Sequence, residues 1–459
     1  MKKLILTVLT ALVGLSLLSA LTLEQSLDLA RKNNKELLSA QSDIVIADQT
    51  YKEVRGMLLP QITLQGAYQI NTTWLPDSVI PPSMDFSESL DEFASANDST
   101  LAGIMTGFYT GMIPKSPMEE GSLAGQIKLD QIIFSGGKLI NGVKAVKRYR
   151  SIQKLRYQLL EQDIVVKTTD MFYQTMLAKK VYDIQEEALT TANRHLQRVE
   201  LLNQEGQISD FDLLRARLEV AKLRPDVVKA HNNYDLALNA FRNQIGFAGS
   251  ELTLEGAFVV PEVRTEDLEN ALQLAEQQRI ELELLSINTE ISKIRYNAEK
   301  GNYLPNVALT AGYSLYTAAD EYKIERDDFG TAFNVGIGFS IPLFTGLSNT
   351  AKRISAKHGY IQAQLKETDT KELITLEVRQ TWQNLQHAVE NYNVQLENIQ
   401  MAERNLQLAQ VRYENQIGIQ LEVFDAQMTL NTIKLSYNNS VYELISANQK
   451  FMKAMGFIL

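Results

Sequence analysis

The stretch that decides the fold is residues 138–205, KLINGVKAVKRYRSIQKLRYQLLEQDIVVKTTDMFYQTMLAKKVYDIQEEALTTANRHLQRVELLNQE. It holds no proline and one glycine, Gly142, and it is rich in Leu, Gln, Glu, Lys and Arg, which lose little rotamer freedom in a helix. Apolar residues recur in steps of three and four, as in Leu177, Val181 and Ile184, so one narrow face suits a neighbouring helix. A single helix of this length would extend about 100 Å, too far for one compact domain.

Each half of the chain repeats this long helix, a glycine turn and a return helix. The pattern stops at a glycine and resumes a few residues later, which predicts two antiparallel helical hairpins. In the first return helix, Pro225 predicts a break or kink. The predicted helices and turns are 138–205, Gly206 and 210–246 in the first half, and 348–417, Gly418 and 421–455 in the second.

The hydrophobic period changes to two in four short segments, which we expect to be β-strands. One face of each segment is apolar and the other polar, as Ile62 and Leu64 alternate with Thr63. An ordinary half-buried soluble sheet alternates in the same way, but soluble domains rarely carry two rods of about 100 Å. The predicted strands are 61–72, 122–133, 306–316 and 332–342.

Between the first two strands, residues 73–122 hold eight acidic residues, five prolines and one lysine. This composition predicts a large acidic loop, partly ordered at most. Its four methionines are more typical of loop packing than of a soft-metal site.

An internal duplication organises the whole chain. Residues 268–315 align without a gap over residues 23–70, with Leu59-Pro60 matching Leu304-Pro305 and Tyr68 matching Tyr313. The leading segment, residues 23–55, predicts one amphipathic helix, with Thr22 and Gln25 spaced for a capping box. We therefore expect a first structural repeat over 21–263 and a second over 264–459.

The N-terminus has the pattern of a secretory signal peptide, expected over residues 1–20. Lys2 and Lys3 precede an apolar run that is too short to cross a bilayer, and Ser19-Ala20 offers small residues for cleavage. A buried N-terminal helix is the alternative interpretation. Removing the two lysines takes the net charge from -10 to -12, and no basic stripe is present, so no nucleic-acid partner is predicted.

A protein that crosses a membrane as β-strands must close its sheet into a barrel, because each unpaired backbone group in hydrocarbon costs several kcal/mol. The four strands of one chain cannot close a barrel. Two chains would give eight strands, and side chains fill the interior of an eight-stranded barrel. Three chains would give twelve strands and leave room for a channel, so a conducting assembly needs at least a trimer.

At this point the sequence resembles the TolC-type outer-membrane efflux proteins over essentially its whole mature length. The resemblance rests on the order of signal peptide, tandem repeat, Leu-Pro before the odd strands, glycine turns, and Ile341-Pro342-Leu343-Phe344-x-Gly346 before a long helix. The first half departs from this pattern, since Ile132 stands where the second has Pro342.

The resemblance implies a mainly α fold with a small β part. Three chains would assemble as a homotrimer, with a 12-stranded β-barrel in outer-membrane lipid above a 12-helix α-barrel that extends into the periplasm. The expected function is the passive exit duct of a tripartite efflux pump or a type I secretion system. The expected partners are a periplasmic membrane-fusion adaptor and an inner-membrane pump or ABC transporter.

The resemblance also places the functional residues at the hairpin turns. Asp212, Glu422 and Asp425 match acidic positions of the family's periplasmic gate, where three chains would form rings of like charge. Their alternative role is to cap or solvate the starts of the return helices. Gln420 stands near the turn where family members carry a basic residue. The expected adaptor-contact residues are Gly206, Gln207, Ile417, Gly418 and Ile419.

No enzyme, metal or cofactor is predicted. The four histidines, His195, His231, His358 and His387, are scattered over helical stretches without the spacing of a metal site or a triad. Two other classes stay open, a stand-alone porin and a periplasmic coiled-coil spacer without a channel. The helical C-terminal stretch counts against the porin, and stable outer-membrane trimers would count against the spacer.

Overall fold

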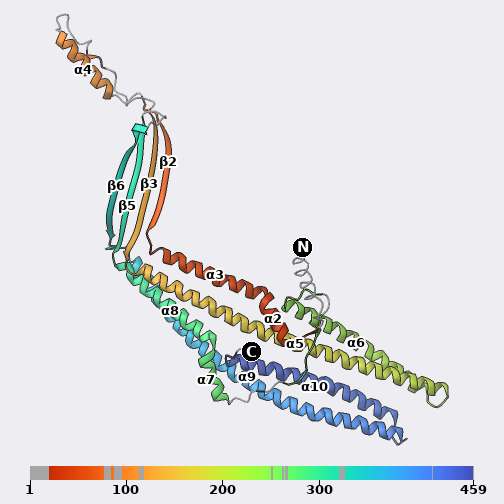
Figure 1. The fold of residues 1–459 in the computed structure, drawn as a ribbon. Coiled ribbons are helices and arrows are strands. Elements are labelled where there is room, and N and C mark those ends of the chain that lie inside the picture. The colour runs from red at the N-terminus through yellow and green to blue at the C-terminus, as the bar shows by residue number, and fades with distance from the viewer. Residues whose placement is uncertain are drawn as a thin grey trace, which may run out of the picture. The chain divides into compact units, whose positions relative to one another are not determined.

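The computed structural model divides the chain into two compact units (Figure 1). The helical unit comprises Met1–Tyr51, Ala145–Ile294 and Ala356–Leu459, and the strand unit comprises Lys52–Lys144 and Arg295–Ser355. Each unit therefore takes segments from both halves of the sequence. The expected signal peptide lies outside the described residues except for Ala20. The structure describes residues 20–76, 84–86, 96–112, 118–249, 252–260, 263, 267–319, 326–415 and 417–457.

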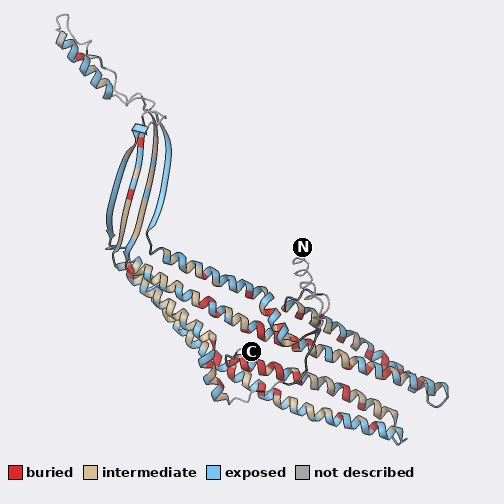
Figure 2. Cartoon of the chain, in the orientation of Figure 1, coloured by how far each residue is buried: buried red, intermediate tan, exposed pale blue. Residues whose placement is uncertain are grey.

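The strand unit contains one antiparallel sheet in the order β2-β3-β5-β6. The register places Leu64 opposite Ile127, Ile127 opposite Tyr313, and Tyr313 opposite Phe333, so one apolar row crosses all four strands. These four side chains are 79%, 50%, 49% and 73% exposed. Figure 2 shows the pale blue of exposed residues along β2 and β6. The strands are β2 (Gln61–Thr73), β3 (Met118–Ser135), β5 (Asn306–Ala319) and β6 (Gly330–Ser340).

The loop between β2 and β3 contains more structure than its composition predicts. A helix, α4 (Ala96–Met112), lies within it, and β3 begins at Met118 rather than at 122. The prediction allowed partial order in this loop but did not include a helix at 96–112. The helix is apolar and exposes Leu101, Ile104 and Phe108. Other parts of the loop fall outside the described residues.

Two long antiparallel hairpins form most of the helical unit (Figure 1). The hairpin helices are α5 (Lys138–Gln204) with α6 (Asp210–Gln244), and α9 (Ser348–Glu414) with α10 (Gln420–Ala454). Of the expected break or kink at Pro225, the break is wrong, since α6 continues through this residue. Proline removes one backbone hydrogen bond there, while Val220 and Leu223 beside it pack on Ala188 and Ala192 of α5 and hold the helix.

The expected single helix over 23–55 is also wrong. The chain forms α2 (Leu23–Asn33) and α3 (Lys35–Gly56), separated by the extended residue Asn34, whose side chain accepts from the backbone of Glu36. The second half breaks at the aligned residue, Arg279, between α7 (Leu268–Gln278) and α8 (Ile280–Lys300). The capping box of Thr22 and Gln25 is confirmed.

Both helix breaks pack against the end of a return helix. Gly246 and Gly456 follow α6 and α10 with positive φ angles of 62° and 88°. A Cβ at Gly246 would lie 2.7 Å from Cβ of Asn33, and one at Gly456 would lie 2.9 Å from the backbone of Gln278. Glycine is therefore required at both positions, by conformation and by close approach.

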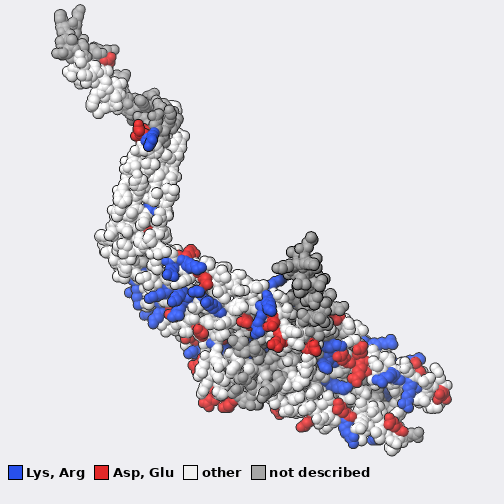
Figure 3. All heavy atoms as spheres, viewed as in Figure 1, with Lys and Arg blue, Asp and Glu red and all other residues white. Residues whose placement is uncertain are grey.

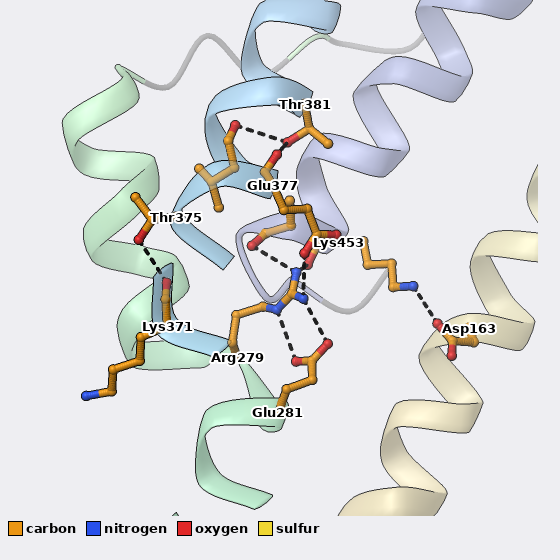
Figure 4. Close-up of polar contacts among 10 residues, drawn as sticks. Asp163, Arg279, Glu281, Lys371, Thr375, Glu377, Thr381 and Lys453 are labelled. Atoms are coloured by element: carbon orange, nitrogen blue, oxygen red, sulfur yellow. Dashed lines mark hydrogen bonds and ion pairs between the residues drawn. The ribbon is translucent and has the colours of Figure 1, made fainter. Parts of the chain in front are cut away.

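Arg279 ties the second break to two other helices (Figure 4). Its side chain is 7% exposed, and its guanidinium contacts Glu281 and Glu377 at 2.9 Å. It also donates to the carbonyl oxygens of Lys453 and Ala454 at 3.4 and 3.3 Å. One side chain thus links the α7–α8 break to α9 and to the C-terminal end of α10.

Each half of the helical unit has its own apolar core beside its helix break. Phe172, Phe241 and Ile245 are buried in the first, together with Leu21 and Leu37. The core of the second half buries Val378, Leu385, Leu444, Phe451 and Met455. The two strands β1 (Ala20–Leu21) and β4 (Thr253–Leu254) pair in parallel beside the first core. These clusters hold the base of each hairpin.

Among the described residues, the helices include none with the length and hydropathy needed to cross a bilayer.

Candidate functional site at the hairpin tips

The first hairpin turns at Gly206, which adopts a positive φ of 71°. Asn203 fixes this turn, since its side-chain amide donates to the carbonyl of Ile208 at 3.2 Å and to Asp210 at 3.1 Å. The neighbouring Gln207 is exposed, and its side-chain amide donates to Glu205 at 2.9 Å. The turn is therefore held from inside the hairpin, and its outer surface stays open to a partner.

The second hairpin turns through Ile417, Gly418 and Ile419. The backbone N–H groups of Ile417 and Gly418 both donate to the carbonyl of Arg412, at 2.9 and 3.1 Å. A Cβ at Gly418 would lie 2.9 Å from Oε2 of Glu422 and 3.1 Å from Cβ of Arg412. Glycine therefore lets this tight turn close over the Arg412 and Glu422 side chains.

Large apolar side chains are exposed at both tips. Ile417 and Ile419 are 74% and 61% exposed, while Phe211 and Leu214 at the start of α6 are 71% and 68% exposed. Exposed apolar side chains that gather at one end of a molecule are typical of a protein interaction site. The expected adaptor-contact residues thus lie on an open, partly apolar surface.

Asp212 lies in the first turn of α6 and takes part in its N-terminal cap. Ser209 donates its hydroxyl to the Asp212 carboxylate at 2.6 Å, and the Asp212 backbone N–H donates to that hydroxyl at 3.2 Å. This is the geometry of the capping alternative. The side chain is also exposed and lines a small cavity of about 70 Å³ between the two hairpins.

Glu422 and Asp425 differ in their surroundings although both begin α10. The Glu422 carboxylate lies 3.6 Å from the guanidinium of Arg412 on α9. Asp425 is exposed, and its carboxylate has no partner among the described residues. Arg412 is a basic partner that we did not predict, because it precedes the turn rather than following it.

Gln420, which stands near the family's basic position, reaches across to the other hairpin. Its side-chain amide nitrogen lies 2.6 Å from Nε2 and 3.0 Å from Nδ1 of His195 on α5. Burial, and then the charge of Arg198, lower the pKa of His195 below its ordinary value of 6.5. No role for His195 is predicted from the sequence, and nothing near it in sequence indicates a contact 225 residues away.

A larger cavity of about 270 Å³ lies beside this contact, between α5 and the α9/α10 hairpin. Ala188, Leu223 and Phe424 give it an apolar wall, and His195 and Tyr413 contribute polar groups. The two hairpins therefore leave unfilled space between them near their tips.

Further from the tips, polar contacts join α5 to α10. The Tyr442 hydroxyl donates to Asp170 at 3.0 Å, and Lys434 contacts Glu187 at 3.2 Å. Burial first, and then the Asp170 charge, raise the pKa of Tyr442 to about 12. The two hairpins of one chain are thus joined through a hydrogen bond and an ion pair.

Within the residues described, no group of three or more His, Cys, Asp or Glu side chains has the geometry of a metal site.

The sequence matches the family model "Outer membrane efflux protein" over residues 26–246 and 271–457. The chain belongs to the outer membrane efflux protein family. TolC of Escherichia coli is 20% identical over 99% of this chain and 87% of its own length. The efflux protein BepC of Brucella suis is 22% identical over 97% of this chain and 88% of its own. This efflux family protein is therefore an outer-membrane protein, as its family and relatives are.

A solved structure shows the same fold. The outer membrane channel CmeC of Campylobacter jejuni superposes with a TM-score of 0.74 at 17% identity, covering 95% of this chain and 85% of its own. The mainly helical architecture with a small antiparallel sheet is thus shared with this channel, as the sequence resemblance implied. Roles for individual tip residues stay predictions.

Proposed function

We propose that this protein is the outer-membrane exit duct of a tripartite efflux pump or of a type I secretion system. The observation that carries the proposal is the apolar row of Leu64, Ile127, Tyr313 and Phe333, which is exposed across the whole sheet. An exposed apolar face of this extent needs a hydrocarbon environment or a partner. Lipid is the cover that fits a family of outer-membrane proteins.

The edges of the sheet support a homotrimer. The sheet ends at β2 on one side and at β6 on the other, so both strands have a free edge in the single chain. In hydrocarbon those edges must pair, and three copies of four strands would close a 12-stranded barrel with a lumen. Thr63, Gln126 and Asn334, on the polar face, would then line that lumen. Three copies of the two hairpins would continue it as a 12-helix tube.

We further propose that the tips form the gate and the docking surface. Asp212, Glu422 and Asp425 would each become a ring of three carboxylates, which attracts cations and resists close approach. Gly206, Gln207, Ile417, Gly418 and Ile419 would contact a periplasmic membrane-fusion adaptor. The exposed Ile417 and Ile419 support this assignment. An inner-membrane pump or ABC transporter would supply the energy, so the duct itself needs no catalytic group.

The division of the chain follows from the same proposal. Residues 1–20 would be removed as a signal peptide on export, and residues 21–263 and 264–459 would each supply one hairpin and two strands. The paired helix breaks at Asn34 and Arg279, which dock on Gly246 and Gly456, support two equivalent repeats.

Two neighbouring residues on opposite faces of β2 test the proposal. Leu64→Lys places a charge on the face assigned to lipid, and Thr63→Lys places the same charge on the face assigned to the lumen. A charge on the lipid face of such a barrel costs about 2–4 kcal/mol near mid-membrane, and one in the lumen far less. Outer-membrane trimers should be lost in the first variant and retained in the second.

The measurement is native gel electrophoresis of detergent-extracted outer membranes, with total cellular protein as the control for expression. Equal trimer levels in both variants would contradict the lipid-facing assignment. A wild-type chain found only as a soluble periplasmic species would favour the spacer.

A further inference from the structure

Charged residues of the strand unit are sorted to the two ends of its sheet. The described strands carry four charged side chains, of which Lys128 and Asp130 pair with each other at 3.0 Å and Glu119 and Glu120 begin β3. The loop side is acidic, with eight acids and one lysine in residues 73–122 and five acids and two bases in residues 320–328. The end of the sheet that joins the helices carries the opposite net charge, which is positive.

Eight basic residues and two acids lie where the strands join the helices, in residues 52–60, 136–144, 295–305 and 341–355. Seven of the eight bases are exposed and Lys138 is half-buried. Figure 3 shows blue side chains gathered at this end of the sheet and a white surface along the strands. We name these eight residues the basic collar. They are Lys52, Arg55, Lys138, Lys144, Arg295, Lys300, Lys352 and Arg353.

The collar is not neutralised by the chain itself. None of its members forms an ion pair among the described residues. Two of them lie over tyrosine rings instead, Lys300 at 4.2 Å from the Tyr296 centroid and Arg353 at 5.7 Å from that of Tyr303. Cations on tyrosine rings stay available to an external anion.

Exposed apolar side chains lie beside the collar in the same unit. Leu343, Phe344 and Leu347 follow β6 and are 94%, 83% and 70% exposed, and Leu59, just before β2, is 64% exposed. Apolar groups bordered by tyrosine and by lysine or arginine are the signature of a membrane–water interface.

We propose that the basic collar binds the anionic phospholipid headgroups of the membrane leaflet nearest the helices. The inference rests on the proposed function, because it takes the sheet to cross the outer membrane. The ligand is the phosphodiester of a net-negative lipid such as phosphatidylglycerol, to which lysine and arginine donate hydrogen bonds while the bordering leucines and Phe344 enter the acyl region.

The test measures which lipids remain with the protein. Purified protein is reconstituted into bilayers of phosphatidylcholine with about 30% phosphatidylglycerol, re-extracted in mild detergent, and its retained lipids are quantified by mass spectrometry. Each basic side chain near an anionic surface contributes an attraction large enough to enrich anionic lipid. We expect at least about a twofold enrichment of phosphatidylglycerol over the bulk bilayer.

Two quadruple variants with equal charge change decide the assignment. The collar variant is Arg55→Gln, Lys144→Gln, Lys300→Gln and Lys352→Gln. The control is Lys180→Gln, Arg224→Gln, Lys229→Gln and Lys450→Gln, whose wild-type side chains are exposed on the helical unit. The collar variant should fall to the bulk lipid ratio, and the control should keep the wild-type enrichment.

Enrichment that persists in the collar variant, or that falls equally in the control, overturns the proposal. Trimer formation and bilayer conductance are recorded on the same samples. Wild-type trimers that conduct but show no lipid preference refute the collar alone, whereas absence of trimers and conductance refutes the exit duct on which it rests.

Discussion

Arg279→Met should loosen the end of α10 more than any exposed arginine substitution. The Arg279 side chain is 7% exposed, and its guanidinium contacts two carboxylates and the carbonyl oxygens of Lys453 and Ala454. Removing one partner of a fully buried pair costs about 3–5 kcal/mol. The Glu281 and Glu377 side chains are 30% and 44% exposed and can rehydrate, which reduces the expected loss to about 2–3 kcal/mol.

The assay is native-state hydrogen exchange of the backbone amides in residues 447–455. A loss of 2–3 kcal/mol corresponds to exchange about 30- to 150-fold faster there. Arg217→Met is the matched control, since Arg217 is 59% exposed in its contact with Glu200 and should change exchange in its own segment by less than about fivefold.

Amides of residues 184–192 report on the other hairpin and should be unchanged by Arg279→Met. An increase of less than about threefold in residues 447–455 would show that Arg279 does not hold this helix end. Equally faster amide exchange in both segments would mean global destabilisation, which contradicts a local role of Arg279 at the end of α10.

Three further predictions concern the tips and the hairpin contact. Gly418→Asp should leave trimer levels normal and abolish transport in a cellular efflux assay, because it crowds the Glu422 carboxylate and adds charge to the docking surface; normal transport would refute the contact assignment. His195 has a lowered pKa, so its stabilising contribution is full above pH 6.5 and is lost as pH falls toward the folded-state pKa. After correction for the slower intrinsic exchange at low pH, the protection of amides near the tip should fall on acidification, and the same fall in protection in His195→Gln would refute this origin. Tyr442→Phe should destabilise the α5–α10 contact by about 1 kcal/mol, measured by exchange around Asp170, and an unchanged rate would show that this hydrogen bond contributes nothing.

The long helices could be predicted because their signal is distributed over many residues. Residues 138–205 combine high helix propensity, one apolar stripe and no proline, and the structure has α5 over Lys138–Gln204. The strands carry an equally direct period of two, with an exposed apolar row that runs from Leu64 to Phe333. Such local periodicities decide local structure wherever packing agrees with them.

The helix breaks could not be predicted, because neither proline nor glycine marks them. Asn34 and Arg279 are extended for reasons that lie elsewhere in the chain, in the docking of Gly246 and Gly456. Helix α4 was missed for the opposite reason, since its glycines and acidic neighbours outweighed a short apolar pattern. Tertiary contacts override propensity in the first case, and a marginal local signal fails in the second.

At the hairpin tips, too, some features could be predicted from the local sequence and others depend on tertiary contacts. Gly206 and Gly418 mark the turns in the sequence itself, because each ends a long periodic stretch. The contact of Gln420 with His195 and that of Arg412 with Glu422 depend on which helix lies beside which, and no spacing rule reports that. The roles of the acidic residues also depend on copies of the chain that would surround a common axis.

Planar-bilayer conductance of the purified protein, beside the Glu422→Ala/Asp425→Ala variant, tests the central claim most directly. A duct closed at its tip by carboxylate rings predicts a small, cation-selective conductance in the wild type, and a larger or less selective one in the variant. A wide, permanently open conductance that the substitutions leave unchanged would contradict the gate and favour a porin. No conductance in either protein would contradict the exit duct itself.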